Sequence, residues 1–178
     1  ARGRRARPLR ALTLAGPELA AAILGKQKRV ENRSWPLPPG MAGEWLALHV
    51  GSGPTPLWIR RYVVNAWKTG TGPQQWRTWE PADSKSPKLP PRSAIVGLIR
   101  VKGMHRLGRG ERRRNPWAIG PICWEIDRAV PLARPIRGVP GFLKLWPVEG
   151  QLKGHQLAYL RKAVSEAQAK RGLGRMIR

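Results

Sequence analysis

The stretch Lys28-Arg29-Val30-Glu31-Asn32-Arg33-Ser34-Trp35 opens an apolar, β-rich part of the chain and places a lysine, a carboxylate and an arginine within six residues. In an extended strand, side chains two apart share a face, so Glu31 and Arg33 point together. Lys28 ends a short helical pattern, and a turn there brings its ammonium to the same place. We therefore predict a polar cluster at this helix-to-strand corner.

The flanking segments predict the elements that hold this corner. Residues 9–14 alternate as a strand, and 17–25 form a short helix that opens on Pro17 and ends at Gly25. Residues 44–50 form a second strand, in which Trp45, Ala47 and His49 share one face. His49 is predicted either to hydrogen-bond within a half-buried layer or to face a cleft.

Four segments in register resemble the ASCH family, relatives of the PUA RNA-binding fold, over roughly residues 9–148. The first is Lys28-x-x-Glu31-x-Arg33 with Ser34-Trp35, and the others are Gly43 to His49, Ala94-Ile95-Val96-Gly97 and Trp117 to Trp124, followed by Pro131-Leu132 and Pro135-Ile136. The resemblance implies an α+β fold, a PUA-like β-barrel with flanking helices. Family members typically have a glycine two residues before the signature lysine, where this chain has Lys26.

The resemblance also implies a ligand pocket made by Lys28, Glu31 and Arg33, to which we add Trp35 and His49 as candidate ligand-binding residues. Some small family members hydrolyse a modified cytidine, with the signature lysine treated as catalytic, and others are reported to cleave RNA. No catalytic residue is assigned here, and Lys28 and Glu31 are the candidates. The alternative interpretation is a salt-bridged corner, with Glu31 between the two cations and no chemistry.

The remainder of the chain predicts further elements and one long loop. A helix starts at Thr55-Pro56 and ends at Gly70, and an apolar strand covers 94–101. Residues 69–92 are rich in Gly, Pro, Ser and Gln and are predicted to be a lid or a segment that a partner orders. Further strands are expected at 117–127 and 139–148, and a final helix at 154–171 that Gly172 ends.

The charge is the dominant feature of the composition. The 178 residues contain 34 Lys and Arg against 10 Asp and Glu, which gives a net charge of +24 and a pI near 11.9. Such a charge calls for a polyanionic partner, first nucleic acid and second an anionic membrane surface. We divide the chain into a basic arm (1–8), an ASCH domain (9–149) and a basic helix and tail (150–178).

The predicted RNA-binding residues lie in the arm, in a glycine-containing loop and in the tail. They are Arg2, Arg4, Arg5, Arg7, Arg10, Arg106, Arg109, Arg112, Arg113, Arg114, Lys170, Arg171, Arg175 and Arg178. Because they surround the domain rather than line a single groove, they favour a protein embedded in folded RNA.

Several other classes of site are not expected. No run of about 18 apolar residues predicts a membrane span. Cys123 is the one cysteine, which excludes an internal disulfide, and it is predicted to pack as a small hydrophobe. The three histidines are far apart in sequence without ligand spacing, so neither a metal site nor a cofactor is predicted.

These observations predict an RNA-binding subunit of a large ribonucleoprotein, with RNA and neighbouring proteins as partners. The example we favour is a mitochondrial or other organellar ribosome. The chain starts with Ala1 and an Arg-rich segment, which fits removal of a transit peptide or a recombinant start, with a cytoplasmic or nuclear location as the alternative. The other hypotheses are a nucleoside amidohydrolase or ribonuclease acting through Lys28, Glu31 and Arg33, and a DNA-binding coactivator module.

Overall fold

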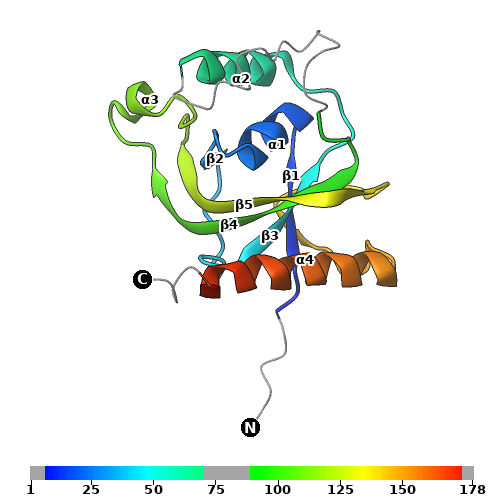
Figure 1. The fold of residues 1–178 in the computed structure, drawn as a ribbon. Helices are drawn as coiled ribbons and strands as arrows, with labels where there is room; N and C mark the ends of the chain where they lie inside the picture. Colours follow the sequence, from blue (N-terminus) through cyan, green and yellow to red (C-terminus); the bar gives the residue numbers. More distant parts are fainter. Residues whose placement is uncertain (1–6, 70–88, 174–178) are drawn as a thin grey trace.

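The computed structural model describes residues 7–69 and 89–173, with side chains as far as Lys170. The elements along the chain are β1 (Arg10–Leu14), α1 (Pro17–Leu24), β2 (Val30–Arg33), β3 (Trp45–Val50), α2 (Leu57–Thr69), β4 (Ala94–Arg106), α3 (Glu111–Arg114), β5 (Ile122–Arg137), β6 (Leu145–Pro147) and α4 (Gly154–Leu173) (Figure 1). The strands form one curled sheet on which the helices pack, and this architecture confirms the predicted α+β class.

The six strands form one mixed sheet in the order β2-β5-β4-β3-β1-β6. β1 and β3 run parallel, and all other neighbouring strands pair antiparallel. The pairing of β4 with β5 contains register shifts, which strengthen the local twist of long strands. As a result the sheet curls into a half-barrel with β2 and β6 at its edges (Figure 1).

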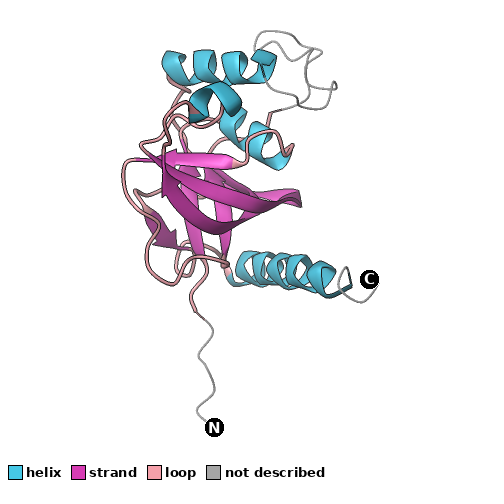
Figure 2. Ribbon diagram, turned by 90° about the vertical axis from the view of Figure 1, so that its left-hand side faces the viewer, coloured by secondary structure: helices cyan, strands magenta, loops and turns pink. Residues whose placement is uncertain are grey.

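The alternation of side chains along β3 divides the core into two layers. Leu46, Leu48 and Val50 face the layer that α1 and α2 cover, whereas Trp45 and Ala47 face the layer that contains residues of α4. Figure 2 shows α1 and α2 on one side of the sheet and α4 on the other. None of the described helices is apolar over a length that would cross a bilayer.

Gly97, in one of the segments that resemble the ASCH family, allows α1 to lie against the sheet. A Cβ atom at this position would come within 2.5 Å of Leu24 Cδ2 and 2.9 Å of the Val130 carbonyl oxygen. Because one of these neighbours is backbone, the sheet could not adjust without disturbing the pairing of β4 and β5. The glycine therefore sets how closely α1, and the corner that follows it, approach the sheet.

Several predicted boundaries agree with the structure and others are wrong. The first helix ends at Gly25 as predicted, and Ile59, Val63 and Ala66 form the buried stripe of α2. The helix predicted to start at Thr55-Pro56 begins at Leu57, and the Thr55 hydroxyl donates to Glu18 Oε2 at 2.5 Å rather than capping α2. The predicted lid falls largely on residues 70–88, which lie outside the described part of the chain.

The later strands differ more from prediction. β4 continues past Val101 to Arg106, and the next strand starts at Ile122 rather than Trp117, because residues 115–121 form an irregular segment held by side chains. The predicted strand at 139–148 shortens to Leu145–Pro147. The predicted arginine loop contains the single turn α3, and α4 continues past Gly172 to Leu173.

Candidate functional site

The turn between α1 and β2 buries the side chain of Lys28. Backbone N–H groups of residues 25–28 donate to carbonyl oxygens of the last turn of α1, including Lys28 N to Ala22 O at 3.0 Å. Lys26 has a φ of 66°, the left-handed conformation that glycine adopts most easily. The position at which ASCH proteins typically have glycine therefore keeps a glycine-like backbone, although this chain has a lysine there.

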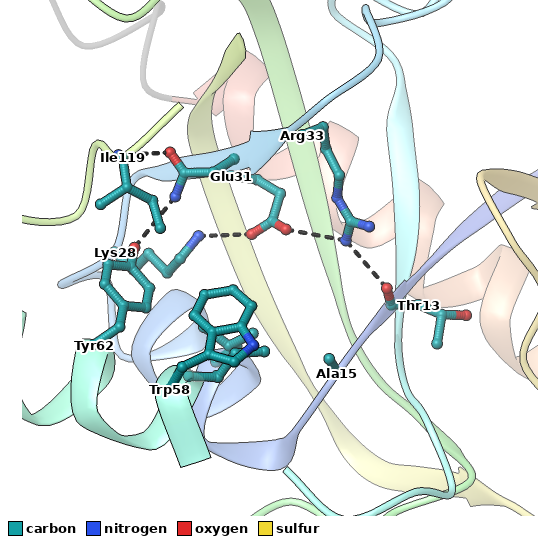
Figure 3. Close-up of a pocket in the computed structure, with 11 residues that line it drawn as sticks. Thr13, Ala15, Lys28, Glu31, Arg33, Trp58, Tyr62 and Ile119 are labelled. Carbon is teal, nitrogen blue, oxygen red and sulfur yellow. Dashed lines mark hydrogen bonds and ion pairs between the residues drawn. The ribbon is translucent and has the colours of Figure 1, made fainter. Parts of the chain in front are cut away.

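Lys28, Glu31 and Arg33 form one connected cluster, as the two-residue period of β2 predicts (Figure 3). Lys28 Nζ lies 2.6 Å from Glu31 Oε2, and Arg33 Nη2 lies 3.0 Å from Glu31 Oε1. Lys28 also donates to the Val30 carbonyl, and Arg33 Nη2 donates to the Thr13 carbonyl at 3.1 Å. Two cations thus share one carboxylate, which leaves the cluster with a net positive charge.

Burial and mutual attraction set the ionisation of this cluster. Burial lowers the pKa of Lys28, although the neighbouring Glu31 carboxylate partly opposes this effect. Burial alone would raise the pKa of Glu31, but the charges of Lys28 and Arg33 outweigh it and hold this pKa below its usual value. Glu31 is therefore ionised at neutral pH, and its two oxygens accept from Lys28 and Arg33.

The cluster forms one wall of a cavity of about 230 Å³ between β2 and α2 (Figure 3). The other walls are formed by Thr13, Ala15, Leu19, Asn32, Trp58, Ile59, Tyr62 and Ile119. Arg33 Nε is buried and has no hydrogen-bond partner. Because sites for drug-sized ligands span roughly 300–1,000 Å³, this cavity suits one small group, such as a base or a phosphate, that can accept a hydrogen bond.

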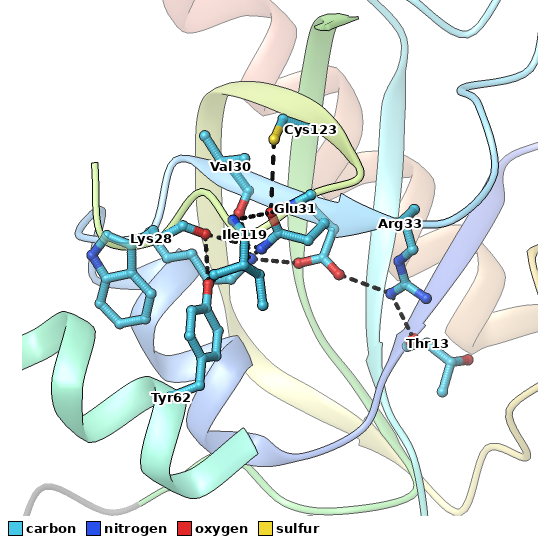
Figure 4. A network of polar contacts seen from close by, with 11 residues as sticks. Thr13, Lys28, Val30, Glu31, Arg33, Tyr62, Ile119 and Cys123 are labelled. Carbon is cyan, nitrogen blue, oxygen red and sulfur yellow. Dashed lines mark hydrogen bonds and ion pairs between the residues drawn. The ribbon is translucent and has the colours of Figure 1, made fainter. Parts of the chain in front are cut away.

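Asn32, which also lines the cavity, joins β2 to the segment that contains Ile119, next to the cluster (Figure 4). Its Oδ1 accepts from the N–H groups of Ile119 and Gly120, both at 2.9 Å, and its Nδ2 donates to the Trp117 carbonyl at 2.9 Å. The Tyr62 hydroxyl donates to the same carbonyl at 2.6 Å. Burial, followed by the nearby Glu31 charge, raises the pKa of Tyr62, so the phenol remains a neutral donor.

The structure does not bring the two other predicted ligand-binding residues into this cavity. Trp35 packs edge-on against Trp124, with ring centroids 4.7 Å apart. His49 is fully buried on the other layer of the sheet, where its Nδ1 lies 3.1 Å from Thr13 Oγ1 and its Nε2 lies 2.7 Å from the Val139 carbonyl oxygen. The cluster of Lys28, Glu31 and Arg33 is therefore the part of the prediction that lines the cavity.

The predicted RNA-binding side chains lie on both sides of the sheet. Arg106 at the end of β4, Arg109 and the three arginines of α3 are exposed. Lys170 is exposed on α4, which covers the other side of the sheet (Figure 2). Arg7 donates to the Gly40 carbonyl at 2.8 Å, and Arg10 is half-buried within β1. The side chains of Arg2, Arg4, Arg5, Arg171, Arg175 and Arg178 lie outside the described part of the chain.

Sequence reasoning missed the aromatic side of the cavity. Tyr62 follows the helical spacing of Ile59, Val63 and Ala66, a pattern that indicates core, yet it lines the cavity as well. Trp58 falls off that stripe and is 62% exposed at the rim. Trp58, a large aromatic side chain outside the apolar stripe of an amphipathic helix, is the feature of the sequence that could have indicated this wall of the cavity.

Comparison with known proteins supplies structural likeness only. No family model matches the chain, and no curated protein sequence matches it. Among solved structures, the chain is similar to ASCH from Zymomonas mobilis, with 12% identity and a TM-score of 0.47 over 88% of this chain and 96% of that one. A serine-to-alanine mutant of the same bacterial protein gives 14% identity and a TM-score of 0.45 over the same shares.

Proposed function

We propose that this chain is an RNA-binding protein of the ASCH type, in which the cavity between β2 and α2 receives one unstacked base or nucleotide. The observation that carries the proposal is the composition of this cavity. It combines a cationic wall, a buried Arg33 Nε without a partner and the aromatic rings of Trp58 and Tyr62. Proteins that read single-stranded RNA stack splayed bases on aromatic rings and hydrogen-bond their edges.

The exposed arginines beside the cavity supply the contacts to the RNA backbone. Arg112 in α3 is close enough to act on the ionisation of Tyr62, which places a cationic surface beside the aromatic wall. Arg112, Arg113 and Arg114 are all exposed, and Arg60 and Arg61 are exposed on the neighbouring α2. A base in the cavity would thus leave its phosphates near several guanidinium groups.

The test is equilibrium binding to single-stranded RNA over a range of salt concentrations, with DNA of the same sequence in parallel. For single strands, log affinity falls with log salt by about 0.7 per phosphate contact. Joint replacement of Arg112, Arg113 and Arg114 by alanine should therefore reduce this slope by about 2 if each contacts one phosphate. An unchanged slope would remove α3 from the interface, and tighter binding to DNA would favour the coactivator-type alternative.

Stacking in the cavity is tested separately through Trp58→Ala. Loss of one base–aromatic stack typically costs about 1–3 kcal/mol of binding free energy, or about 5- to 150-fold in affinity, and leaves the salt slope unchanged. Leu57→Ala is the matched control, because Leu57 is 61% exposed on the same helix and does not line the cavity. Equal affinities of the two variants would contradict base binding at this site.

We further propose that the chain is a stable subunit of a large ribonucleoprotein, such as an organellar ribosome. The support is the net charge of +24 and the presence of exposed cations on both sides of the sheet. The test is purification of the native complex at moderate salt, with sequencing of the RNA that accompanies it. Recovery with ribosomal RNA and other basic proteins is expected, whereas recovery of the protein alone and free of RNA would refute this proposal.

A second candidate function is hydrolysis of a modified nucleoside, which the ASCH resemblance implies. It is favoured by the burial of Lys28, which lowers its pKa, because a lysine must lose its proton to act as a base or nucleophile. The test is turnover of acylated cytidines by the wild type and by Lys28→Met, with folding of the variant checked by circular dichroism. Wild-type turnover that Lys28→Met abolishes would support catalysis, whereas an inactive wild type would reject it.

A further inference from the structure

A second group of reactive side chains lies where β4 ends and β5 begins. It is next to the cavity wall, since Cys123 Sγ donates to Asn32 Oδ1 at 3.8 Å. His105 on β4 and Cys123 on β5 are direct partners in the strand register. Glu111 is the first residue of α3, which lies in the connection between β4 and β5. One ligand atom from each of these three residues lies within 4.8 Å of the other two. The chain thus brings imidazole, thiol and carboxylate together from three separate segments.

These three groups are the donor types that zinc uses in proteins. Zinc binds cysteine sulfur at about 2.3 Å, histidine nitrogen at about 2.0–2.1 Å and carboxylate oxygen at about 2.0–2.2 Å, so tetrahedral ligand atoms lie roughly 3.3–3.8 Å apart. His105 Nε2 and Glu111 Oε1 are now 2.6 Å apart. A small outward movement of these side chains would therefore make room for the ion.

The surroundings hold the ligands in the orientation that a metal site needs. The Gly108 N–H donates to Glu111 Oε2 at 2.7 Å, so that the other oxygen faces His105. On the opposite side of the imidazole ring, Nδ1 lies 3.8 Å from Glu125 Oε1. This distance is too long for a hydrogen bond, and a rotation of either side chain that closes it would let Glu125 accept from Nδ1. A carboxylate in that position is the usual companion of a metal-bound histidine, because it fixes the tautomer and the ring orientation.

The exposure of the three side chains gives an entry route. Cys123 is fully buried, whereas the side chains of His105 and Glu111 are 36% and 16% exposed. An ion can therefore reach the sulfur from the solvent side through the other two ligands. Arg114 also acts electrostatically on the Glu111 carboxylate, and its positive charge opposes the approach of a cation.

We propose that His105, Glu111 and Cys123 bind a zinc ion, with a fourth position open to water or another ligand. The ion replaces the direct His105–Glu111 contact and links the β4–β5 hairpin to the start of α3. A simple His–Glu ion pair explains the 2.6 Å contact but needs no sulfur. Participation of Cys123 therefore separates a metal site from an ion pair.

Cobalt(II) titration of the complete reduced chain tests this proposal. Because Cys123 is the one cysteine in the sequence, a thiolate-to-cobalt charge-transfer band can arise only from that sulfur. We expect the band to saturate at one equivalent of cobalt. It should disappear when zinc is added, because zinc binds such sites more tightly than cobalt. Absence of the band, or binding of zinc to Cys123→Ser with wild-type affinity, would overturn the proposal.

The other two ligands are tested by His105→Gln and Glu111→Gln, which keep the thiol but should abolish the band. His155→Gln is the control, because His155 is exposed on α4 and should leave the band intact. Glu125→Gln should weaken zinc binding by about 10–100-fold, the usual effect of losing such a supporting carboxylate. A zinc-dependent rise in Tm that persists in His105→Gln would contradict this ligand set.

Discussion

The two faces of the sheet both bury ionisable side chains, and they treat them differently. On the α4 side, His49 has a partner for each ring nitrogen, and Gly141 packs so closely on the ring that a Cβ would lie 2.7 Å from His49 Cε1. On the α1 and α2 side, Arg33 keeps a buried Nε without a partner beside an open cavity. Buried polar groups are normally satisfied, but Glu149 Oε2 on the α4 side also lacks a partner, so the unpartnered atom alone does not separate the faces. What indicates a ligand site is the open cavity that Arg33 lines.

The strongest test of this comparison is Glu31→Gln. The substitution leaves the buried Lys28 and the half-buried Arg33 without a counter-charge, and breaking a buried pair typically costs about 3–5 kcal/mol of unfolding free energy. Denaturant unfolding at neutral pH measures the loss. Glu166→Gln is the control, since its pair with Lys162 is exposed at 4.0 Å and should contribute almost nothing.

The closed face should respond to a change in packing. Leu160 of α4 is fully buried in the layer with Trp45 and Ala47, so Leu160→Ala should cost about 2–5 kcal/mol through lost burial and the cavity left behind. Leu143→Ala, at a position 93% exposed, should leave unfolding unchanged. If folded Leu160→Ala also lost RNA affinity selectively, the two faces would not be separate in function.

The sequence was sufficient for those parts of the site that depend on local geometry. The two-residue period of a strand placed Glu31 beside Arg33, and Gly25 marked the turn that brings in Lys28. These features need only the nearest neighbours along the chain. The predicted end of α1 agrees with the structure for the same reason, whereas the predicted end of α2, Gly70, lies outside the described residues.

Features that depend on long-range strand pairing could not be predicted. The meeting of His105 with Cys123 requires the register of β4 against β5, which no spacing along the sequence contains. The irregular segment before β5 exists because Asn32, far away in sequence, binds the backbone of Ile119 and Gly120. An apolar run such as 117–127 cannot reveal that partner, so its first residues were predicted to be strand.

A smaller effect on the closed face is a dependence of stability on pH. Burial lowers the pKa of His49 below its ordinary value of 6.5, so at acidic pH the unfolded chain binds a proton that the folded chain resists. Unfolding free energy should therefore fall as the pH drops from about 7.5 to about 5.5, above the range in which Glu31 titrates. His49→Gln should reduce this fall and His155→Gln should not; an equal fall in all three proteins would contradict the assignment to His49.

The smallest expected effect concerns the turn between α1 and β2, which precedes the cluster of Lys28, Glu31 and Arg33. Lys26 has a φ of 66°, a conformation that costs a residue with a Cβ about 1–2 kcal/mol, whereas glycine adopts it freely. Lys26→Gly should stabilise the fold by only about 0.5–1 kcal/mol, because glycine also gains entropy in the unfolded chain. Lys26→Ala is the control, since it removes the same charge and retains the Cβ. If both variants unfold at the same denaturant concentration, the backbone at this corner is not strained, and the lysine in place of the glycine typical of ASCH proteins has no cost to stability.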